Sequence, residues 1–587
     1  MRPQPFPGAP PFTRRIGAVA LLAALLAGAP EAWAAKARPP APAPRGWVVD
    51  RVRFEPLDPA TTLVADGAGE YRGALEVGAA SGGLATVNEL GLDDYLQGLA
   101  EVPPTWPAEA MRAQAIAART YALHEIQSSV ATPFRGAGAQ ICATDSCQVY
   151  TGMARERQDG AQAWNAAVVA TSGQVVLYKG APINAKYSAS NGGRTSAGSE
   201  PYLRSVGDPD DAASPYHHWH YTLPLAAFAP VLGVTAPATL VSLVRDGDTI
   251  VSRVQPPAPP APPTPPGQLP PPLPAPTAQT MGVGDFIAKV NGSVPNPPGL
   301  PLPLPSGRFG LATEGDQAVV DGGGWGHGVG LNQWGAFAKA RRGLKAADIL
   351  AAYYGGLRPT VLPAGQLPAT IRVAVALGQA QSTVSAGGRF RVLDGAGHPL
   401  AALALGRWQV AAAGAGRVRV VPPQGYDQPL AITSLAVDPA SPFAGSPATL
   451  HFLVSTPAVV KMTVEAPGMA PVTVEPGVID AGEAAQTLPA ATRGGDYRIL
   501  IQADAGPGRT AVLPVIFTVA GPARALIPPP SLLAAPRGVH LWDRPLTAWR
   551  EFPSRAPLLL AALLLLADGA GLVVARGRRR AARLRLH

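Results

Sequence analysis

Hydrophobic residues in the first part of the chain follow two different periods. Trp47–Phe54 and Tyr71–Val77 have the pattern of short strands. Further along, apolar residues recur at i, i+3, i+4 and i+7, the spacing of an amphipathic helix, at Leu92, Tyr95, Leu96 and Leu99. We expect this helix to end near Val102, because the two prolines that follow cannot continue it.

A second helix is expected within EVPPTWPAEAMRAQAIAARTYALHE, residues 101–125. It begins around Pro107, with Glu109 in its first turn, where both residue types are favoured, and it runs to about Ile126. Gln114 and Tyr121 share one face of this helix with three alanines. Such small residues let a ligand approach closely, although a tightly packed structural helix would show the same pattern.

Beyond Tyr354 the pattern changes to the period of two that is typical of strands. Apolar residues alternate with small or polar ones along Ile371–Val375, and similar stretches surround Phe390 and Val418. These stretches predict a small β module over residues 361–427.

Residues 428–521 are predicted to form an immunoglobulin-like β-sandwich. Apolar residues alternate along Val460–Val464 and Tyr497–Ile501, and turns rich in Gly and Pro separate the short strands. Helical and strand patterns therefore occupy different parts of the chain, which indicates an α+β fold class.

A proline-rich tract divides the chain. From Pro256 to Pro276 there are 13 prolines in 21 residues, which predicts an extended polyproline spacer. Motifs with candidate chemistry lie on both sides of it. We therefore interpret residues 255–279 as an insertion within a single domain over residues 46–357.

The formal net charge of +9 is concentrated at the two ends of the chain. Residues 1–36 carry a net +3 and the tail from Arg576 a net +6, so the residues between them are neutral. This distribution argues against nucleic acid as a partner, because no basic stripe covers the central part of the chain.

The N-terminal residues have the features of a secretory signal peptide. Arg14 and Arg15 precede an apolar run from Ile16 to Ala27, and Ala32-Trp33-Ala34 supplies an A-x-A cleavage site. A signal peptide is therefore expected over residues 1–34, and the export route, general or twin-arginine, stays open.

The apolar run Ala556–Ala575 is just long enough to cross a bilayer. Asp568 within it costs roughly 2.5–3.5 kcal/mol, whereas each Leu or Val returns about 0.3–0.6 kcal/mol, so eight leucines and two valines offset the cost. The arginine-rich tail, residues 576–587, follows directly and is expected in the cytoplasm. We expect an exported chain anchored in the cytoplasmic membrane by one transmembrane helix, with a buried C-terminal helix as the alternative.

Glu101 is the first candidate for chemistry. We expect it at the C-terminal end of the first helix, where the macrodipole disfavours an ionised carboxylate by a few tenths to about 1 kcal/mol. Burial beside Trp106 would raise its pKa further, and a carboxylic acid kept protonated near neutral pH suits a general acid for glycosidic cleavage. A solvated glutamate gives the same local pattern, and the local pattern alone favours that interpretation.

Two loops rich in small residues are further candidates. KYSASNGGRTSAGSE, residues 186–200, offers many donors but lacks the Gly-Lys-Ser/Thr of a phosphate-binding loop. DGGGWGHGVGLNQWGA, residues 321–336, presents Trp325 and His327 on a backbone that other groups approach closely, which suits stacking against carbohydrate. Turn structure explains the first loop nearly as well, and a single histidine is more often structural.

The two cysteines of the chain, Cys142 and Cys147, lie in CATDSCQVY. In an exported chain they would by default be paired or open to pairing. A zinc site would need two further ligands, and no histidine lies in this loop.

Taken together, the motifs resemble the SpoIID/LytB family. They occur in the family's order within residues 46–357, as NELGLDDYLQGLAEVPPTWPAEAMRAQAIAARTYAL, CATDSCQVYTG, YSASNGGRT with PYLRSV, DPDD and SPYHHW, and GWGHGVGLNQWGA with ILAAYYGG. Members of that family include lytic transglycosylases that act on glycan strands stripped of stem peptides, and proteins named as amidase enhancers.

The resemblance implies a SpoIID-type catalytic domain in which Glu101 is the catalytic acid and base. Glu101 would cleave the bond between N-acetylmuramic acid and N-acetylglucosamine and leave a 1,6-anhydro end. The substrate-binding residues that the resemblance implies are Trp106, Gln114, Arg119, Tyr121, Tyr187, Ser188, Ser190, Asn191, Gly192, Gly193, Thr195, Trp325, His327 and Gln333.

Zinc-binding relatives carry a histidine just before the second cysteine, where this chain has Ser146. The resemblance therefore implies no metal or other cofactor and favours a disulfide between Cys142 and Cys147, with free thiols as the alternative.

The leading hypothesis is a membrane-anchored lytic transglycosylase whose partner is the glycan strand of peptidoglycan. A non-catalytic peptidoglycan-binding protein or amidase enhancer, which would work with a cell-wall amidase, is the alternative from another class. A structural spacer of the envelope is the third hypothesis.

Overall fold

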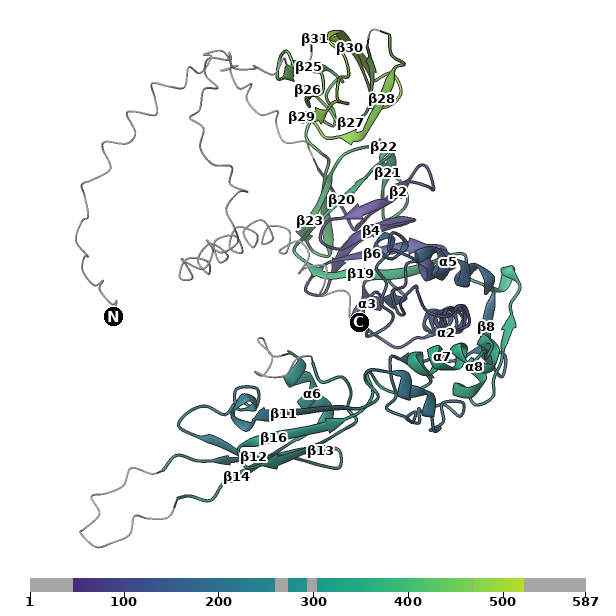
Figure 1. Cartoon of the computed structure of the whole chain (residues 1–587), viewed down its shortest axis with the longest axis vertical. Coiled ribbons are helices and arrows are strands. Elements are labelled where there is room, and N and C mark those ends of the chain that lie inside the picture. Colours follow the sequence, from purple (N-terminus) through teal and green to yellow (C-terminus); the bar gives the residue numbers. More distant parts are fainter. Residues whose placement is uncertain (1–45, 259–272, 293–302, 467, 522–587) are drawn as a thin grey trace, which may run out of the picture. The chain divides into compact units, whose positions relative to one another are not determined.

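The computed structural model describes residues 46–258, 273–292, 303–466 and 468–521. Within these ranges the protein is a mixed α and β structure with several sheets (Figure 1). The predicted signal peptide, transmembrane helix and basic tail lie outside the described residues. Among the described residues, no helix is both long and apolar enough to span a bilayer.

Strands from two distant parts of the sequence form the first two sheets. Their strand orders are β1-β24-β23-β20-β3-β4 and β22-β21-β2-β5-β6-β19-β7. The bounds are β1 (Trp47–Val49), β2 (Arg51–Pro56), β3 (Leu63–Ala65), β4 (Gly69–Tyr71), β5 (Ala74–Ala80), β6 (Gly83–Leu90), β7 (Ile141–Cys142), β19 (Ile371–Gln379), β20 (Gln381–Ala386), β21 (Phe390–Asp394), β22 (Pro399–Ala404), β23 (Trp408–Gly414) and β24 (Arg417–Val421).

This pairing corrects the predicted domain boundary near residue 360. Strands of residues 371–421 pair with strands of residues 47–90, and both groups contribute to one hydrophobic core that includes Phe54, Val384 and Trp408. Alternation along the chain reveals strands but not their partners, so residues 361–427 were expected to stand alone. They complete the sheets that the N-terminal strands begin.

The alanine-rich helix α2 (Ala108–Gln127) is at the centre of the helical part and starts directly after Pro107, as its sequence predicts. It contacts α5 (Ala161–Ala170), α7 (Gln333–Arg341) and α8 (Ala346–Tyr353). Twelve of its 20 residues are buried, because its small side chains admit neighbours on several sides.

Short elements connect this helical group to the sheets. The helices are α1 (Leu92–Gln97), α3 (Pro133–Gly136) and α4 (Met153–Glu156), and the 3-10 turns are η1 (Pro209–Ala213), η2 (Leu225–Phe228) and η3 (Ala364–Gln366). The strands are β8 (Gln174–Tyr178), β9 (Ala181–Pro182), β10 (Tyr187–Ser188), β17 (Leu331–Asn332) and β18 (Pro359–Val361).

The residues before and after the proline tract form a subdomain with a core of its own, which includes Phe228, Leu243 and Phe286, while residues 259–272 of the tract lie outside the described residues. Its elements are β11 (Trp219–Pro224), β12 (Thr239–Asp246), β13 (Thr249–Gln255), β14 (Thr277–Gly282), α6 (Val283–Gly292), β15 (Phe309–Glu314) and β16 (Gln317–Gly322). Strands β13 and β14, which precede and follow the tract in the chain, pair with each other. The predicted insertion, residues 255–279, is too short, because the subdomain also includes β11, β12, α6, β15 and β16.

The C-terminal described residues form two antiparallel sheets around a shared core that includes Leu450, Met462 and Ile501. One sheet has the order β25-β26-β29 and the other β28-β27-β30-β31. The bounds are β25 (Ile432–Asp438), β26 (Thr449–Val454), β27 (Ala458–Glu465), β28 (Val472–Ile479), β29 (Gly482–Thr487), β30 (Gly495–Asp504) and β31 (Thr510–Val519).

Candidate active site

Glu101 lies in a short ladder between two chain segments and not at a helix end. Helix α1 ends at Gln97, and the chain beyond it pairs with another segment; Gly98 allows the ring of Tyr150 to approach closely, because any side chain there would collide with that ring. Leu99 then pairs with Tyr150, and the Ala100 N–H donates to the Val149 carbonyl over 2.9 Å. The expectation that this helix reaches Val102 is therefore wrong, and Glu101 does not lie at the C-terminal end of its macrodipole.

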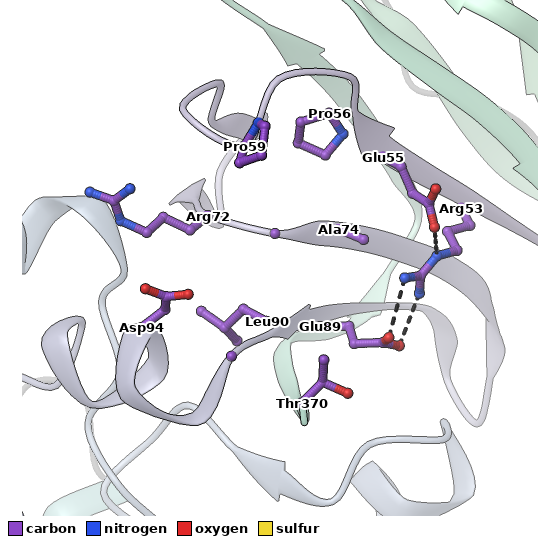
Figure 2. A pocket seen from close by; sticks show the side chains of 12 residues that line it. Arg53, Glu55, Pro56, Pro59, Arg72, Ala74, Glu89, Leu90, Asp94 and Thr370 are labelled. Atoms are coloured by element: carbon purple, nitrogen blue, oxygen red, sulfur yellow. Dashed lines mark hydrogen bonds and ion pairs between the residues drawn. The ribbon is translucent and has the colours of Figure 1, made fainter. Parts of the chain in front are cut away.

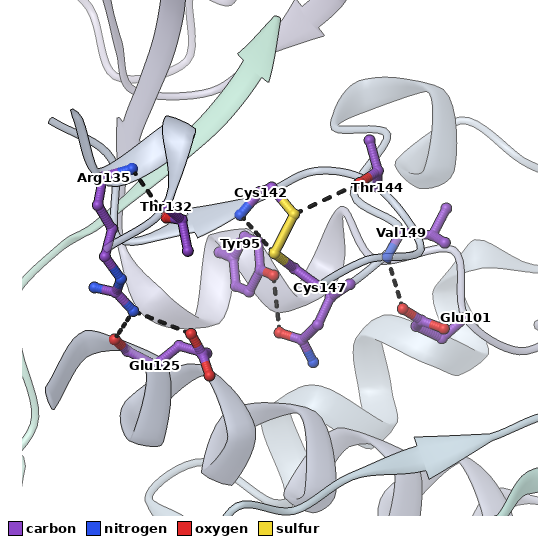
Figure 3. The surroundings of a disulfide bond; sticks show 10 residues. Tyr95, Glu101, Glu125, Thr132, Arg135, Cys142, Thr144, Cys147 and Val149 are labelled. Atoms are coloured by element: carbon purple, nitrogen blue, oxygen red, sulfur yellow. Dashed lines mark hydrogen bonds and ion pairs between the residues drawn. A yellow bond between two sulfur atoms is a disulfide. The ribbon is translucent and has the colours of Figure 1, made fainter. Parts of the chain in front are cut away.

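The same ladder holds the Glu101 carboxylate. The Val149 N–H donates to Glu101 Oε1 over 2.6 Å (Figure 3). Burial raises the pKa of Glu101 to about 7, although the hydrogen bonds from Val149, Tyr187 and Gln333 each act to lower it. Burial therefore brings the pKa of Glu101 close to neutral pH, where both the protonated and the ionised forms are accessible.

Tyr187 and Gln333 reach Glu101 because two short strands bring their loops together. β10 and β17 pair in parallel, with Tyr187 opposite Leu331, and Gln333 follows directly as the first residue of α7. Gln148 Nε2 donates to the Tyr187 hydroxyl over 2.8 Å, which fixes the ring, while burial raises the pKa of Tyr187 well above its usual value. Tyr187 therefore remains a neutral hydrogen-bond donor.

Gln114 supports Gln333 from helix α2. Gln333 Nε2 donates to Gln114 Oε1 over 3.4 Å, and Gln114 is 1 % exposed. Gln114 Nε2 is buried and has no hydrogen-bond partner among the described residues. The resemblance implies that both glutamines bind substrate. The structure places them side by side, next to Glu101.

Two predicted aromatic residues flank this group. Tyr121 meets Tyr187 edge to face with 6.4 Å between ring centres, and burial raises the pKa of Tyr121 to about 12. Trp106 packs against Trp334 and Phe337 of α7, with 5.1 Å between ring centres in both pairs. Trp106 therefore joins the Pro-rich turn after Glu101 to the helix that carries Gln333.

The polar side chains of the loop at residues 186–200 are engaged inside the protein. Ser190 Oγ donates to Asp211 Oδ1 over 2.7 Å, and Asn191 Nδ2 donates to Asp208 Oδ2 over 2.9 Å. Ser188 Oγ accepts from the Gly328 N–H and Thr195 Oγ1 donates to the Arg204 carbonyl. These four side chains were predicted to bind substrate; they are buried and instead hold the loop in shape.

A buried ion pair anchors the loop from behind. Lys339 Nζ lies 2.6 Å from Asp208 Oδ1, and the Tyr353 hydroxyl donates to Asp208 Oδ2 over 2.7 Å. Burial alone would raise the pKa of Asp208, but the hydrogen bonds from Lys339, Tyr353 and Asn332 lower it. This charged cluster was not among the predicted site residues, and the only sign of it in the sequence is the DPDD motif.

The two glycine-rich segments touch each other through their backbones. Gly192 and Gly193 have φ values of 62° and 91°, and a side chain at Gly192 would come within 2.9 Å of the Gly323 backbone. The ring of Trp325 lies 4.4 Å from that of Tyr216. The glycines therefore permit close contact between loops, and Trp325 sits where those loops meet.

His327 is tied to the backbone. The Val329 N–H donates to its Nδ1 over 3.0 Å, so the ring proton is on Nε2, and the ring also hydrogen-bonds the Tyr187 backbone. Desolvation by the surrounding protein and the positive charge of Lys186 lower the pKa of His327. A neutral ring in this position supports the segment that carries Tyr187.

Arg119 does not line the site. It is fully buried, and its guanidinium donates to Asp93 Oδ1 over 2.9 Å and to the Thr171 and Val168 carbonyls. The assignment of Arg119 to substrate is therefore corrected, since its charge and donors are used to join helices α1, α2 and α5.

Cys142 and Cys147 form a disulfide (Figure 3). With both sulfurs bonded to each other and a serine at position 146, this loop does not fit a zinc ion. No group of three or more His, Cys, Asp or Glu side chains within the described ranges is placed to hold a metal. The disulfide closes the loop whose next residues, Gln148 and Val149, bond Tyr187 and Glu101.

These features define a class of site: a single buried carboxylic acid, held by a backbone N–H and flanked by tyrosine and glutamine, in an α+β domain. Residues 80–178 match the SpoIID family model, described as Stage II sporulation protein. This part of the chain is therefore similar to the SpoIID family.

Curated relatives extend the similarity. The chain is 28 % identical to Stage II sporulation protein D of Bacillus subtilis (strain 168), over 46 % of this chain and 75 % of the relative. It is 27 % identical to Stage II sporulation protein D of Bacillus amyloliquefaciens, over 46 % of this chain and 75 % of that protein. It is also 28 % identical to the Amidase enhancer of Bacillus subtilis (strain 168), over 44 % of this chain and 38 % of that protein. The family and these names indicate a role related to the cell wall.

Proposed function

We propose that this protein is a lytic transglycosylase that cleaves the bond between N-acetylmuramic acid and N-acetylglucosamine in denuded peptidoglycan strands. The observation that carries the proposal is Glu101, a carboxylic acid whose pKa of about 7 makes both its protonated and its ionised forms accessible near neutral pH. The groups that hydrogen-bond Glu101 are the Val149 N–H, Tyr187 and Gln333, none of them a carboxylate, and Asp145 acts on it only through its negative charge. A reaction that uses one carboxyl group twice fits this arrangement.

The proposed reaction returns the proton that it uses. Protonated Glu101 donates its proton to the glycosidic oxygen as the bond from that oxygen to the anomeric carbon breaks. The resulting carboxylate takes the proton of the muramic 6-hydroxyl as its oxygen bonds to the anomeric carbon. The products are a free N-acetylglucosamine hydroxyl and a 1,6-anhydro end, with Glu101 protonated again and no water consumed.

The neighbouring groups support each stage. The Val149 N–H, Tyr187 and Gln333 stabilise the carboxylate once it has formed, because each donates to it. Burial favours the protonated acid that begins the reaction. These opposing effects keep the pKa close to the working pH, where a group that acts as acid and then as base is most efficient.

The test is to incubate the full-length protein with denuded glycan strands and to measure anhydro-muramic ends by mass spectrometry. We expect such ends from the wild type, none from Glu101→Gln, and wild-type release from the control Glu314→Gln, which changes an exposed glutamate. Intact strands after incubation with the wild type would overturn the proposal. Equal release by wild type and Glu101→Gln would overturn the role of Glu101.

A second candidate function follows from the similarity to the Amidase enhancer. In that case the protein would bind glycan without cleaving it and would stimulate a cell-wall amidase. Binding of denuded strands that yields no anhydro ends, combined with faster amide hydrolysis when a purified amidase is added, would favour this candidate.

We further propose that the chain is exported and anchored by residues 556–575, and that the two-sheet C-terminal module is an immunoglobulin-like spacer. The apolar run, the arginine tail and the signal-like N-terminus support the first point. Membrane fractionation with protease accessibility of the β-sandwich tests the topology, and protection of the sandwich in intact spheroplasts would contradict it.

A further inference from the structure

A pocket on the N-terminal sheet is lined by residues other than those around Glu101. It has a volume of about 520 Å³, within the range of pockets that hold small molecules. Strands β2, β5 and β6, helix α1 and the loop after β2 contribute its walls (Figure 2). Nothing in the proposed reaction uses this pocket.

One end of the pocket is closed by ion pairs. Arg53 donates from Nε to Glu55 over 2.5 Å and from Nη1 and Nη2 to Glu89 over 2.9 and 3.2 Å (Figure 2). Arg372 and Arg391 add further pairs to Glu89 and Glu55. All three nitrogens of Arg53 are therefore occupied, and this end offers a ligand little to bind.

The opposite end of the pocket has a hydrogen-bond donor and an acceptor that are free to bind a ligand. Arg72 donates from Nε and Nη2 to Glu156, which leaves its Nη1 without a hydrogen-bond partner in the described parts of the chain. Asp94 faces the same space, and its carboxylate takes part in no hydrogen bond or ion pair with any described residue. Burial is the largest cause that raises the pKa of Asp94, Glu156 and Asp93 add to it, and the charge of Arg72 opposes it.

The wall between the two ends is mainly apolar. Ala74 and Leu90 line one side, and Pro56 and Pro59 line the other (Figure 2). A ligand that fits this space therefore has an aliphatic stem and, at one end, both a cation for Asp94 and an anion for Arg72.

We propose that this pocket binds the zwitterionic amino-acid end of a short peptide, with Asp94 accepting from its ammonium group and Arg72 Nη1 donating to its carboxylate. The aliphatic stem lies along Ala74 and Leu90. Pairing each ligand charge with a group of opposite charge gives charge-assisted hydrogen bonds, the stronger class. The side chain of a peptide ending in lysine supplies only the ammonium group at this end of the pocket.

We expect the ligand to be a cell-wall peptide that contains a diamino dicarboxylic acid. This identification of the ligand rests on the proposed function. Such a residue is joined to the peptide through one of its amino-acid ends and keeps the other end free as a zwitterion. The pocket would then hold a neighbouring strand that still carries peptides, while Glu101 acts on a strand that has lost them.

Isothermal titration of the full-length protein tests the pocket with three probes: alanyl-γ-glutamyl-diaminopimelate, the same tripeptide ending in lysine, and free diaminopimelate. We expect binding of the first and at least tenfold weaker binding of the second, because the lysine peptide lacks the carboxylate for Arg72. The free amino acid should bind more weakly than the tripeptide; equal binding would overturn the wall-peptide source.

Two variants complete the experiment. Asp94→Asn should weaken the diaminopimelate peptide at least tenfold, whereas Asp50→Asn, an exposed carboxylate outside the pocket, should leave it unchanged. Undiminished binding by Asp94→Asn, or no binding by the wild type, would overturn the proposal. Release of anhydro ends from denuded strands is measured in parallel and should be equal in wild type and Asp94→Asn, so failure of the proposed reaction is seen separately.

Discussion

Replacing Glu101 with glutamine should stabilise the protein at alkaline pH and not at acidic pH. Burial raises the pKa of Glu101 from 4.5 to about 7, so the folded protein binds its proton more tightly than the unfolded chain does. Below about pH 4.5 this difference in pKa does not change the free energy of unfolding. As pH rises from 4.5 to about 7 the free energy of unfolding falls, and above about pH 7 the loss is complete. At 1.36 kcal/mol per pKa unit, the full cost is about 3 kcal/mol.

Differential scanning calorimetry of the full-length protein at pH 5 and pH 8 measures this cost. Glutamine cannot ionise and keeps an oxygen for the Val149 N–H, so the transition that contains the site should rise at pH 8 by several degrees. At pH 5 the variant and the wild type should differ little, and Glu314→Gln should match the wild type at both values. An equal change in melting temperature at pH 5 and pH 8 would refute this reasoning. It would show that ionisation of Glu101 does not lower the stability of the folded protein.

Three further outcomes are expected. The rate of anhydro-end formation should fall about tenfold per pH unit above pH 7, because protonated Glu101 is required, and a rate that is flat to pH 9 would contradict this. Lys339→Met should cost about 3–5 kcal/mol in urea unfolding, because it leaves Asp208 buried and unpaired; a loss below 1 kcal/mol would show that the pair is dispensable. Replacing Cys142 and Cys147 with serine should lower stability by about 2 kcal/mol, as closing so short a loop predicts, and should abolish the effect of reductant on the melting temperature.

Local sequence patterns predicted the elements around Glu101 better than their ends. The start of α2 after Pro107 was readable because proline and an acidic first turn mark a helix start. The end of α1 was not, because Leu99 and Ala100 leave the helix to pair with Tyr150 and Val149, about fifty positions away in the chain. A raised pKa of Glu101 was expected from a helix end and from burial; burial is its largest cause, whereas the pairing with Val149 was not predicted from the sequence.

The resemblance grouped residues of different roles. Glu101, Tyr187, Gln333 and Gln114 do come together, whereas Arg119 and the loop residues Ser190 and Asn191 are bonded within the protein. A motif preserves whatever the site needs, including the scaffold, so a polar residue in a motif can face inward as readily as outward. Only the tertiary contacts distinguish the two cases.

The one unsatisfied group in this cluster carries information about the site. A buried amide N–H without a partner costs about 1–3 kcal/mol, and Gln114 Nε2 is such a group. It sits beside Gln333, which bonds both Gln114 and the catalytic candidate Glu101. Replacing Gln114 with an apolar residue would remove that cost but would also remove the acceptor that orients Gln333. The costs at Glu101 and Gln114 therefore fall in one place, and the proposed reaction accounts for both, because it needs an acid that is held in position before the substrate binds.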